Sequence, residues 1–203
     1  MRKFLFIYFA VMILVSGSVK AQIDTDRMTI IGRNALYFED YVLAIQHFNQ
    51  VIRAKPYLAE PYYFRAVGKY HLEDYKGALD DCDKALERNP YLVDAYNLRG
   101  ILYQQIEQPA SSVKDFKKGL EIDPGNVNLL INLGIAHLQL EEYEKAIDVY
   151  SNVLEESPNH VAAYLNRGLA RFSLEDTTGA VQDFSKAIDA NPYIPDGYVN
   201  RSM

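Results

Sequence analysis

Residues 161–194 read VAAYLNRGLARFSLEDTTGAVQDFSKAIDANPYI, and most of the remaining chain repeats this segment. Five of the eight prolines follow one another at intervals of 34 residues, at Pro56, Pro90, Pro124, Pro158 and Pro192. A fixed period of this length indicates stacked copies of one supersecondary unit. We therefore define repeats 1 to 5 as residues 25–58, 59–92, 93–126, 127–160 and 161–194, with a partial sixth repeat at 195–203.

Within each repeat, apolar and small residues recur with helical spacing. When the proline is position 32, positions 4, 7, 8 and 11 share one face of a first helix, and positions 17, 20, 24 and 27 share one face of a second. Small residues at positions 8 and 20 allow the two helices to approach closely. Each second helix should end just before its proline, and Pro109 should open one. Cys82, at position 24 of repeat 2, is expected in the core.

This pattern resembles the tetratricopeptide repeat, whose signature combines a large residue, a small residue, alanine, an aromatic and proline at these offsets. The resemblance covers residues 25–194. It implies an all-α fold, a right-handed α-solenoid of stacked antiparallel helix pairs whose first helices line a concave face. The chain departs from the signature in having no tryptophan, and repeat 3 carries Pro109 and Ser112 at two signature positions.

The first 21 residues do not belong to the repeats. Arg2 and Lys3 precede an apolar run at residues 4–15. The run is followed by a short segment rich in small residues, which ends at Ala21. This arrangement is typical of a signal peptide over residues 1–21, followed by a mature array over 22–203. The run is shorter than the roughly 20 residues that span a bilayer, although an uncleaved membrane anchor is the alternative. We therefore expect export to a bacterial periplasm or cell envelope.

The charge and the residue types restrict the function. Without residues 1–21 the chain has 18 basic and 27 acidic residues, a formal charge of −9. Such a surface repels phosphate backbones, so nucleic acid is not an expected partner. The four histidines form no metal-binding spacing, and the sequence has no phosphate-binding loop or nucleophile motif. We expect no metal, no cofactor and no catalysis, and we expect His137 to be a packed, hydrogen-bonded core residue.

Two positions of the repeats change together. Position 7 is arginine and position 23 is aspartate in repeats 2, 3 and 5, whereas repeats 1 and 4 have neither. Because an arginine fork matches a carboxylate in geometry, we predict an ion pair between the two helices of each of these repeats. The predicted pairs are Arg65–Asp81, Arg99–Asp115 and Arg167–Asp183. We expect them to fix the register of the paired helices.

The resemblance also implies a binding surface, because positions 2, 5, 9, 12 and 13 of the first helices face the hollow side in this family. The candidate partner-binding residues are Arg33, Tyr37, Tyr63, Tyr70, His71, Asn97, Gln104, Gln105, Ile131, Ile135, Leu138, Leu165, Leu169 and Phe172. The aliphatic residues of repeats 4 and 5 should form an exposed stripe, which usually marks a binding surface. Downstream helices or a second copy of the chain are alternative covers for it. A receptor for chaperone C-terminal tails is not expected, because position 9 lacks asparagine.

These observations favour a non-catalytic scaffold that binds a peptide or protein segment on its concave face. One alternative is the targeting array of a longer enzyme or signalling protein, because the repeat pattern continues to Met203 and we expect the chain to be a fragment. Another is a glycan-binding envelope protein, in which Tyr63 and Tyr70 would stack on sugars.

Overall fold

The structure, a computed structural model, describes residues 25–202, so the predicted signal segment lies outside the described residues. All regular secondary structure in this range is α-helical. The first helix covers residues 25–37. It is followed by α2 (Tyr41–Ala54), α3 (Glu60–His71), α4 (Tyr75–Arg88), α5 (Val93–Gln105), α6 (Pro109–Ile122), α7 (Val127–Gln139), α8 (Tyr143–Glu156), α9 (Val161–Ser173), α10 (Thr177–Ala190) and α11 (Pro195–Arg201).

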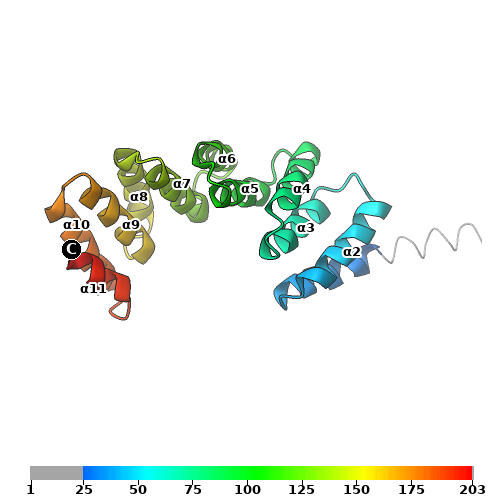
Figure 1. Cartoon of the computed structure of the whole chain (residues 1–203), viewed down its shortest axis with the longest axis horizontal. Helices are drawn as coiled ribbons and strands as arrows, with labels where there is room; N and C mark the ends of the chain where they lie inside the picture. Colours follow the sequence, from blue (N-terminus) through cyan, green and yellow to red (C-terminus); the bar gives the residue numbers. More distant parts are fainter. Residues whose placement is uncertain (1–24, 203) are drawn as a thin grey trace, which may run out of the picture. The chain divides into compact units, whose positions relative to one another are not determined.

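The chain forms two compact bodies that divide between Pro90 and Tyr91. The N-terminal body, described over residues 25–90, contains helix 25–37 with α2, and α3 with α4 (Figure 1). The C-terminal body, residues 91–202, stacks the pairs α5–α6, α7–α8 and α9–α10 and ends with α11. The all-α class and the stacked helix pairs predicted from the sequence are confirmed.

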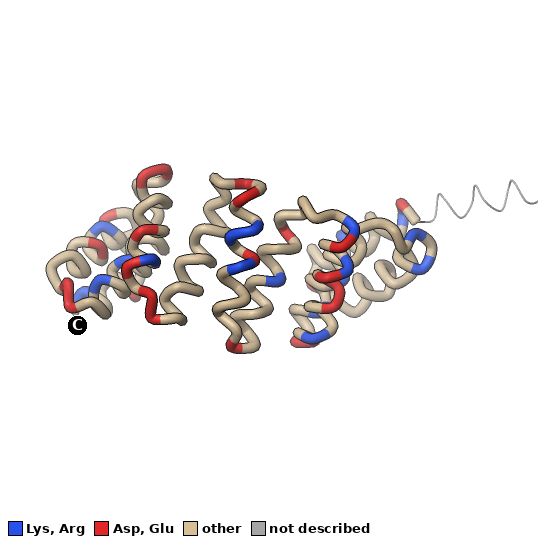
Figure 2. Tube along the Cα trace, turned by 90° about the horizontal axis from the view of Figure 1, so that it is seen from above, with Lys and Arg blue, Asp and Glu red and all other residues tan. Residues whose placement is uncertain are grey.

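One turn geometry joins the helices of every pair. Two residues after the end of each first helix lies a glutamate in the left-handed region, with φ between 57° and 63°. These glutamates are Glu39, Glu73, Glu107, Glu141 and Glu175. In repeat 2 the next residue, Asp74, donates its N–H to the Lys69 carbonyl at 2.9 Å, which closes the end of α3. The Asp74 carboxylate then accepts the N–H of Gly77 at 3.0 Å and caps α4. Acidic residues accordingly lie at several of the turns (Figure 2).

The second helices begin and end where the sequence predicts. Pro109 is the first residue of α6, and Asp123, which precedes Pro124, follows its last residue. Similarly, Asn89 follows α4 and precedes Pro90. The prolines therefore mark the helix ends because the preceding residue is sterically excluded from the helical region.

The core of most repeats is an aromatic ring packed on a glycine. Phe48, Phe116, Tyr150 and Phe184, all at position 24, are fully buried. A Cβ atom on Gly168 would lie 2.5 Å from Cε1 of Phe184, so this close approach requires glycine. In repeat 2 the pair is Ala66 and Cys82, both completely buried. There the smaller sulfur side chain leaves room for the extra methyl group, and the predicted burial of Cys82 is confirmed.

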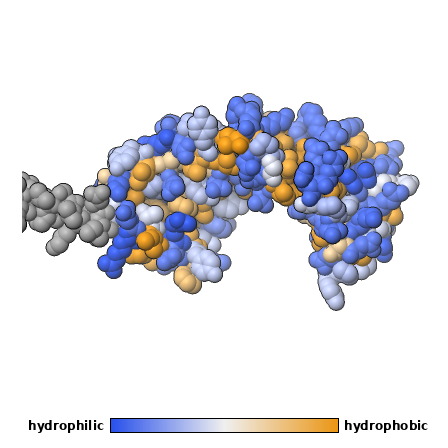
Figure 3. Space-filling model, turned by 180° about the vertical axis from the view of Figure 1, so that it is seen from behind, coloured by the Kyte–Doolittle hydropathy of each residue, from blue (hydrophilic) through white to orange (hydrophobic). Residues whose placement is uncertain are grey.

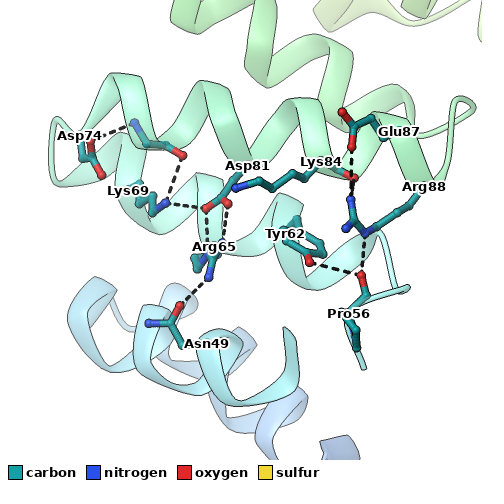
Figure 4. A network of polar contacts seen from close by, with 11 residues as sticks. Asn49, Pro56, Tyr62, Arg65, Lys69, Asp74, Asp81, Lys84, Glu87 and Arg88 are labelled. Carbon is teal, nitrogen blue, oxygen red and sulfur yellow. Dashed lines mark hydrogen bonds and ion pairs between the residues drawn. The ribbon is translucent and has the colours of Figure 1, made fainter. Parts of the chain in front are cut away.

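All three predicted ion pairs are present, and each is bidentate. Asp81 is completely buried and accepts from Nε and Nη2 of Arg65 at 2.8 and 2.5 Å (Figure 4). Corresponding bonds join Arg99 to Asp115 at 2.7 and 2.6 Å and Arg167 to Asp183 at 2.9 and 2.7 Å. A second cation, not predicted, reaches the aspartate in two repeats: Lys69 contacts Asp81 at 2.7 Å and Arg171 contacts Asp183 at 2.9 Å.

Each of these arginines also makes contacts outside the ion pair. Arg65 lies over the ring of Tyr62 with 5.6 Å to the centroid, and the Tyr62 hydroxyl donates to the carbonyl of Pro56 in repeat 1. Arg65 Nη1 donates to Asn49 Oδ1 at 2.6 Å, which ties repeat 2 to repeat 1. The arginine therefore connects both the paired helices and the successive repeats.

Candidate functional site

The first helices of the C-terminal body form its inner row. Helix α5 contacts α7, α7 contacts α9 and α9 contacts α11, whereas the described second helices α6, α8 and α10 make no comparable contact with one another. Consecutive pairs therefore lie closer together on the side of the first helices. This side of the body is concave, as the resemblance implies for first helices.

Amide side chains occupy the part of this face that α5 contributes. Asn97 and Gln104 are half-buried and Gln105 is exposed. The Asn132 amide on α7 donates to Asn97 Oδ1 at 2.9 Å, and Gln104 Nε2 donates to the Asn132 carbonyl at 3.4 Å. These amides link α5 to α7, so only part of their hydrogen-bonding capacity faces solvent.

The aliphatic part of the face is narrower than the sequence suggests. Leu165 is only 9% exposed and packs with Ala180, Phe184 and Ala187 of α10, so its prediction as an exposed residue is wrong. The cause is the close packing of α9 on α10. Ile131, Leu138 and Leu169 are half-buried against core clusters.

Among the predicted apolar residues of α7 and α9, Phe172 is the most exposed. Ile135 is half-buried and Phe172 is 40% exposed. Lysine and arginine are absent from positions 2, 5, 9, 12 and 13 of α5, α7 and α9, where the one charged residue is Asp94. The face thus offers apolar and amide groups without a cation to hold a carboxylate.

The predicted residues of the N-terminal body lie among aromatic side chains. Tyr37 is 81% exposed on helix 25–37, and Arg33 lies over the Phe64 ring with 5.2 Å to the centroid. A cleft of about 420 Å³ includes both Arg33 and Tyr37. On α3, Tyr70 contacts His71 edge-on with centroids 5.3 Å apart. Tyr63 lies beside Phe64 on the same helix, with 5.2 Å between the ring centroids.

A larger cleft in the N-terminal body was not predicted. It measures about 580 Å³ and involves Asp26, Ile30, Tyr57 and Glu60. Tyr57 belongs to the loop between α2 and α3, which a search for helical faces does not examine. Hydrophobic residues reach the surface in both bodies, interspersed with hydrophilic ones (Figure 3).

The candidate metal-ligating side chains of the described residues are dispersed. In residues 25–202, no three His, Cys, Asp or Glu side chains are arranged to hold a metal ion. His137 is buried as predicted, and its Nδ1 lies 2.6 Å from Glu142 Oε2. Burial lowers the pKa of His137, and the interaction with Glu142 opposes this only in part. Across this same range, no helix combines the length and apolar character needed to cross a bilayer.

Comparison with known families identifies the repeat. The tetratricopeptide repeat family matches residues 97–159 and again residues 131–195. Residues 97–195 are therefore tetratricopeptide repeats. The match covers most of the C-terminal body, and the same residue pattern continues through repeats 1 and 2. No curated protein matches the chain.

Solved structures of tetratricopeptide repeat proteins have the same fold. The chain is similar to YrrB, described as a TPR protein with an unusual peptide-binding site, with 18% identity, a TM-score of 0.78, and coverage of 93% of this chain and 97% of that one. It is also similar to MamA from Desulfovibrio magneticus, with 19% identity, a TM-score of 0.78, and coverage of 85% and 97%. A third is a tetratricopeptide repeat protein from Parabacteroides merdae, with 21% identity, a TM-score of 0.72, and coverage of 87% and 69%.

Proposed function

We propose that this repeat protein is a non-catalytic scaffold that binds a peptide or protein segment on the faces of its first helices. The observation that carries the proposal is the row formed by α5, α7, α9 and α11, whose inner face presents amides beside partly exposed aliphatic and aromatic groups. A surface already shaped before binding loses little conformational entropy on association. The peptide-binding site named for the YrrB structure supports the same class of function.

Capture of a partner by engineered variants tests the proposal. The mature chain would be used to capture partners from cell-envelope extract, as wild type and as Ile135→Asp/Phe172→Asp. A matched control is Val181→Asp on the second helix α10, because Val181 is also 40% exposed. We expect wild type and the control to retain a partner that the double variant loses. Retention of the same partner by all three proteins, with unchanged melting temperatures, would disprove the assignment of this face.

We further propose that the protein acts in a bacterial periplasm or cell envelope. The support for this proposal is the sequence of residues 1–21, with its basic start, apolar run and small residues before Gln22. Mass spectrometry of the protein isolated from its own cells tests it. A mature chain that begins at Gln22 in the envelope fraction is expected, and a chain retained in the cytoplasm with an intact N-terminus contradicts the proposal.

A further inference from the structure

The unpredicted cleft of the N-terminal body combines two carboxylates with an exposed aromatic ring. We call it the tyrosine–carboxylate cleft and define it by Asp26, Ile30, Tyr57, Leu58 and Glu60. Its volume of about 580 Å³ lies within the range of known ligand pockets. It is built from helix 25–37, the loop between α2 and α3, and the first residue of α3.

The two carboxylates of this cleft are exposed to solvent. The Asp26 side chain is 79% exposed even though Lys55 Nζ lies 3.4 Å from its Oδ1. Glu60 is also exposed. Besides Lys55 at Asp26, a second cation, Arg88, is among the residues that line the cleft. The Arg88 side chain is already engaged, because its Nε donates to the Pro56 carbonyl at 2.6 Å and its Nη1 donates to the Lys84 carbonyl at 2.7 Å.

Figure 4 shows the Arg88 side chain directed toward Pro56 and beside Tyr62. Its guanidinium carbon lies 4.2 Å from the centroid of the Tyr62 ring. Arg88 also has the carboxylate of Glu87 at 3.7 Å. Because these contacts hold it in place, Arg88 is poorly placed to neutralise Asp26 or Glu60.

The apolar part of the cleft is accessible as well. Tyr57 is 70% exposed, Ile30 is 61% exposed and Leu58 is 36% exposed. The face of an aromatic ring attracts a cation, and carboxylates form charge-assisted hydrogen bonds with lysine and arginine. Ile30 and Leu58 can receive the methylene groups of such a side chain or an apolar neighbour.

We propose that the tyrosine–carboxylate cleft binds a lysine or arginine side chain of a partner segment in which the adjacent residue is apolar. The inference rests on the proposed function, because it names the chemistry of the segment that the N-terminal body receives. The proposed cleft should prefer cationic peptides. A site that captures a partner's terminal carboxylate has the opposite preference, because it requires cations of its own.

The C-terminal body supplies an internal comparison. Tyr193 corresponds in repeat position to Tyr57, and Asp196 corresponds to Glu60. Tyr193 is 92% exposed, but Ala162 occupies the position that corresponds to Asp26. The surface around Tyr193 and Asp196 therefore has one carboxylate instead of two, and we expect it to bind a cationic side chain much more weakly.

Fluorescence anisotropy with short labelled peptides tests the proposal. The probes are three fluorescein-labelled nonapeptides with a central leucine flanked on both sides by lysine, serine or glutamate, within a glycine–serine sequence. In 50 mM salt we expect the lysine peptide to bind about tenfold more tightly than the glutamate peptide, which corresponds to two exposed ion pairs. We expect the affinity for the lysine peptide to fall about tenfold in Asp26→Asn/Glu60→Gln and about threefold in Tyr57→Leu.

The matched control is Tyr193→Leu/Asp196→Asn, for which unchanged affinity is expected. Equal binding of all three peptides, or unchanged binding of the lysine peptide by Asp26→Asn/Glu60→Gln, overturns the inference. The proposed function is tested separately by Ile135→Asp/Phe172→Asp. If that variant retains its captured partner while the peptides still show the charge preference, the proposed function of the inner face fails and the cleft assignment stands.

Discussion

Repeats 4 and 5 follow one another in the C-terminal body and have the same pair of helices, but the chemistry between those helices differs. In repeat 5, Arg167 and Asp183 form a bidentate ion pair, and Asp183 is only 2% exposed. In repeat 4 the same positions hold Leu133, which is buried, and Val149, which packs against the same cluster. Pairing of the two helices therefore does not require the ion pair.

The comparison suggests that the ion pair determines alignment more than strength. Replacing a buried ion pair by well-packed apolar residues is often neutral or stabilising, whereas removing one partner is costly. In repeat 5, Arg167 Nη1 also contacts Ser151 Oγ of repeat 4 at 3.0 Å, at the repeat position where Asn49 contacts Arg65. The arginine thus holds its own repeat and the preceding one in a defined register.

The largest effect is expected when one partner of the pair is removed. Arg167→Leu leaves the buried Asp183 with a single bond to Arg171, so we expect the free energy of unfolding to fall by about 3 kcal/mol. Arg167→Leu/Asp183→Val copies repeat 4 and should restore most of this loss. Urea titration followed by circular dichroism measures both variants. A single variant that loses less than the double variant would contradict the interpretation that the carboxylate depends on its partner.

A second large effect should come from the glycine that both repeats place under the aromatic ring. In repeat 5 the ring of Phe184 leaves no space for a Cβ atom on Gly168. Gly168→Ala should therefore lower the free energy of unfolding by about 2 kcal/mol, because overpacked cores typically lose 1–3 kcal/mol. The control is Gly125→Ala, where a Cβ atom would meet nothing within 4 Å. Equal stability of the two variants would show that the ring moves aside freely.

A third prediction concerns pH and separates repeat 4 from repeat 5, because position 11 is His137 in one and Arg171 in the other. The folded state lowers the pKa of His137 below its usual value of 6.5, mainly through burial. The neutral His137 imidazole therefore contributes to the free energy of unfolding. This contribution is fully present above pH 6.5 and is lost as the pH falls toward the lower pKa of the folded state. Over this range Glu142 remains ionised, because its pKa is lowered by Lys145 and then by His137.

Thermal melts between pH 7.5 and pH 5 measure this difference. The wild-type melting temperature should fall more steeply with acidification than that of His137→Leu, which has no titrating group at the site. Parallel curves for the two proteins would mean that the histidine does not contribute to the pH dependence of folding.

Most of the fold could be predicted because its causes are local or repeated. The proline period fixed the helix ends, and the joint change of positions 7 and 23 identified the pairs Arg65–Asp81, Arg99–Asp115 and Arg167–Asp183. The second cations on Asp81 and Asp183 were missed because position 11 varies between repeats and is uncharged in repeat 3, which has the same Arg–Asp pair. The left-handed glutamates were missed because this conformation favours glycine, and glutamate gives no such signal.

The candidate site could be predicted only in part. Helical periodicity separates the faces of a single helix, but the exposure of Leu165 depends on α10, which packs against α9. The tyrosine–carboxylate cleft was missed for a different reason. Asp26 and Glu60 both occupy position 2, which the family resemblance places on the hollow side, but Tyr57 lies in a loop outside the helical pattern, so the cleft that the three residues form becomes visible only in three dimensions.

The smallest effect is expected at Tyr150, where repeat 4 differs from repeat 5 by one hydroxyl group. Burial raises the pKa of this hydroxyl, and Asn166 opposes the rise only in part. Within the described structure the Tyr150 oxygen makes no hydrogen bond of ordinary geometry. Removing a buried, unpaired polar group without changing the ring is close to neutral or stabilising. We therefore expect Tyr150→Phe to leave the free energy of unfolding unchanged or to raise it by at most about 1 kcal/mol.

A loss of more than about 1 kcal/mol in Tyr150→Phe would instead indicate a hydrogen bond that stabilises the fold. A double-mutant cycle with Asn166→Ala would locate it, because a bond between the two side chains makes their effects non-additive. Additive effects together with an unchanged or higher stability would show that the aromatic ring, and not its hydroxyl, is what repeats 4 and 5 have in common at this position. The variation between tyrosine and phenylalanine there would then have no structural cost.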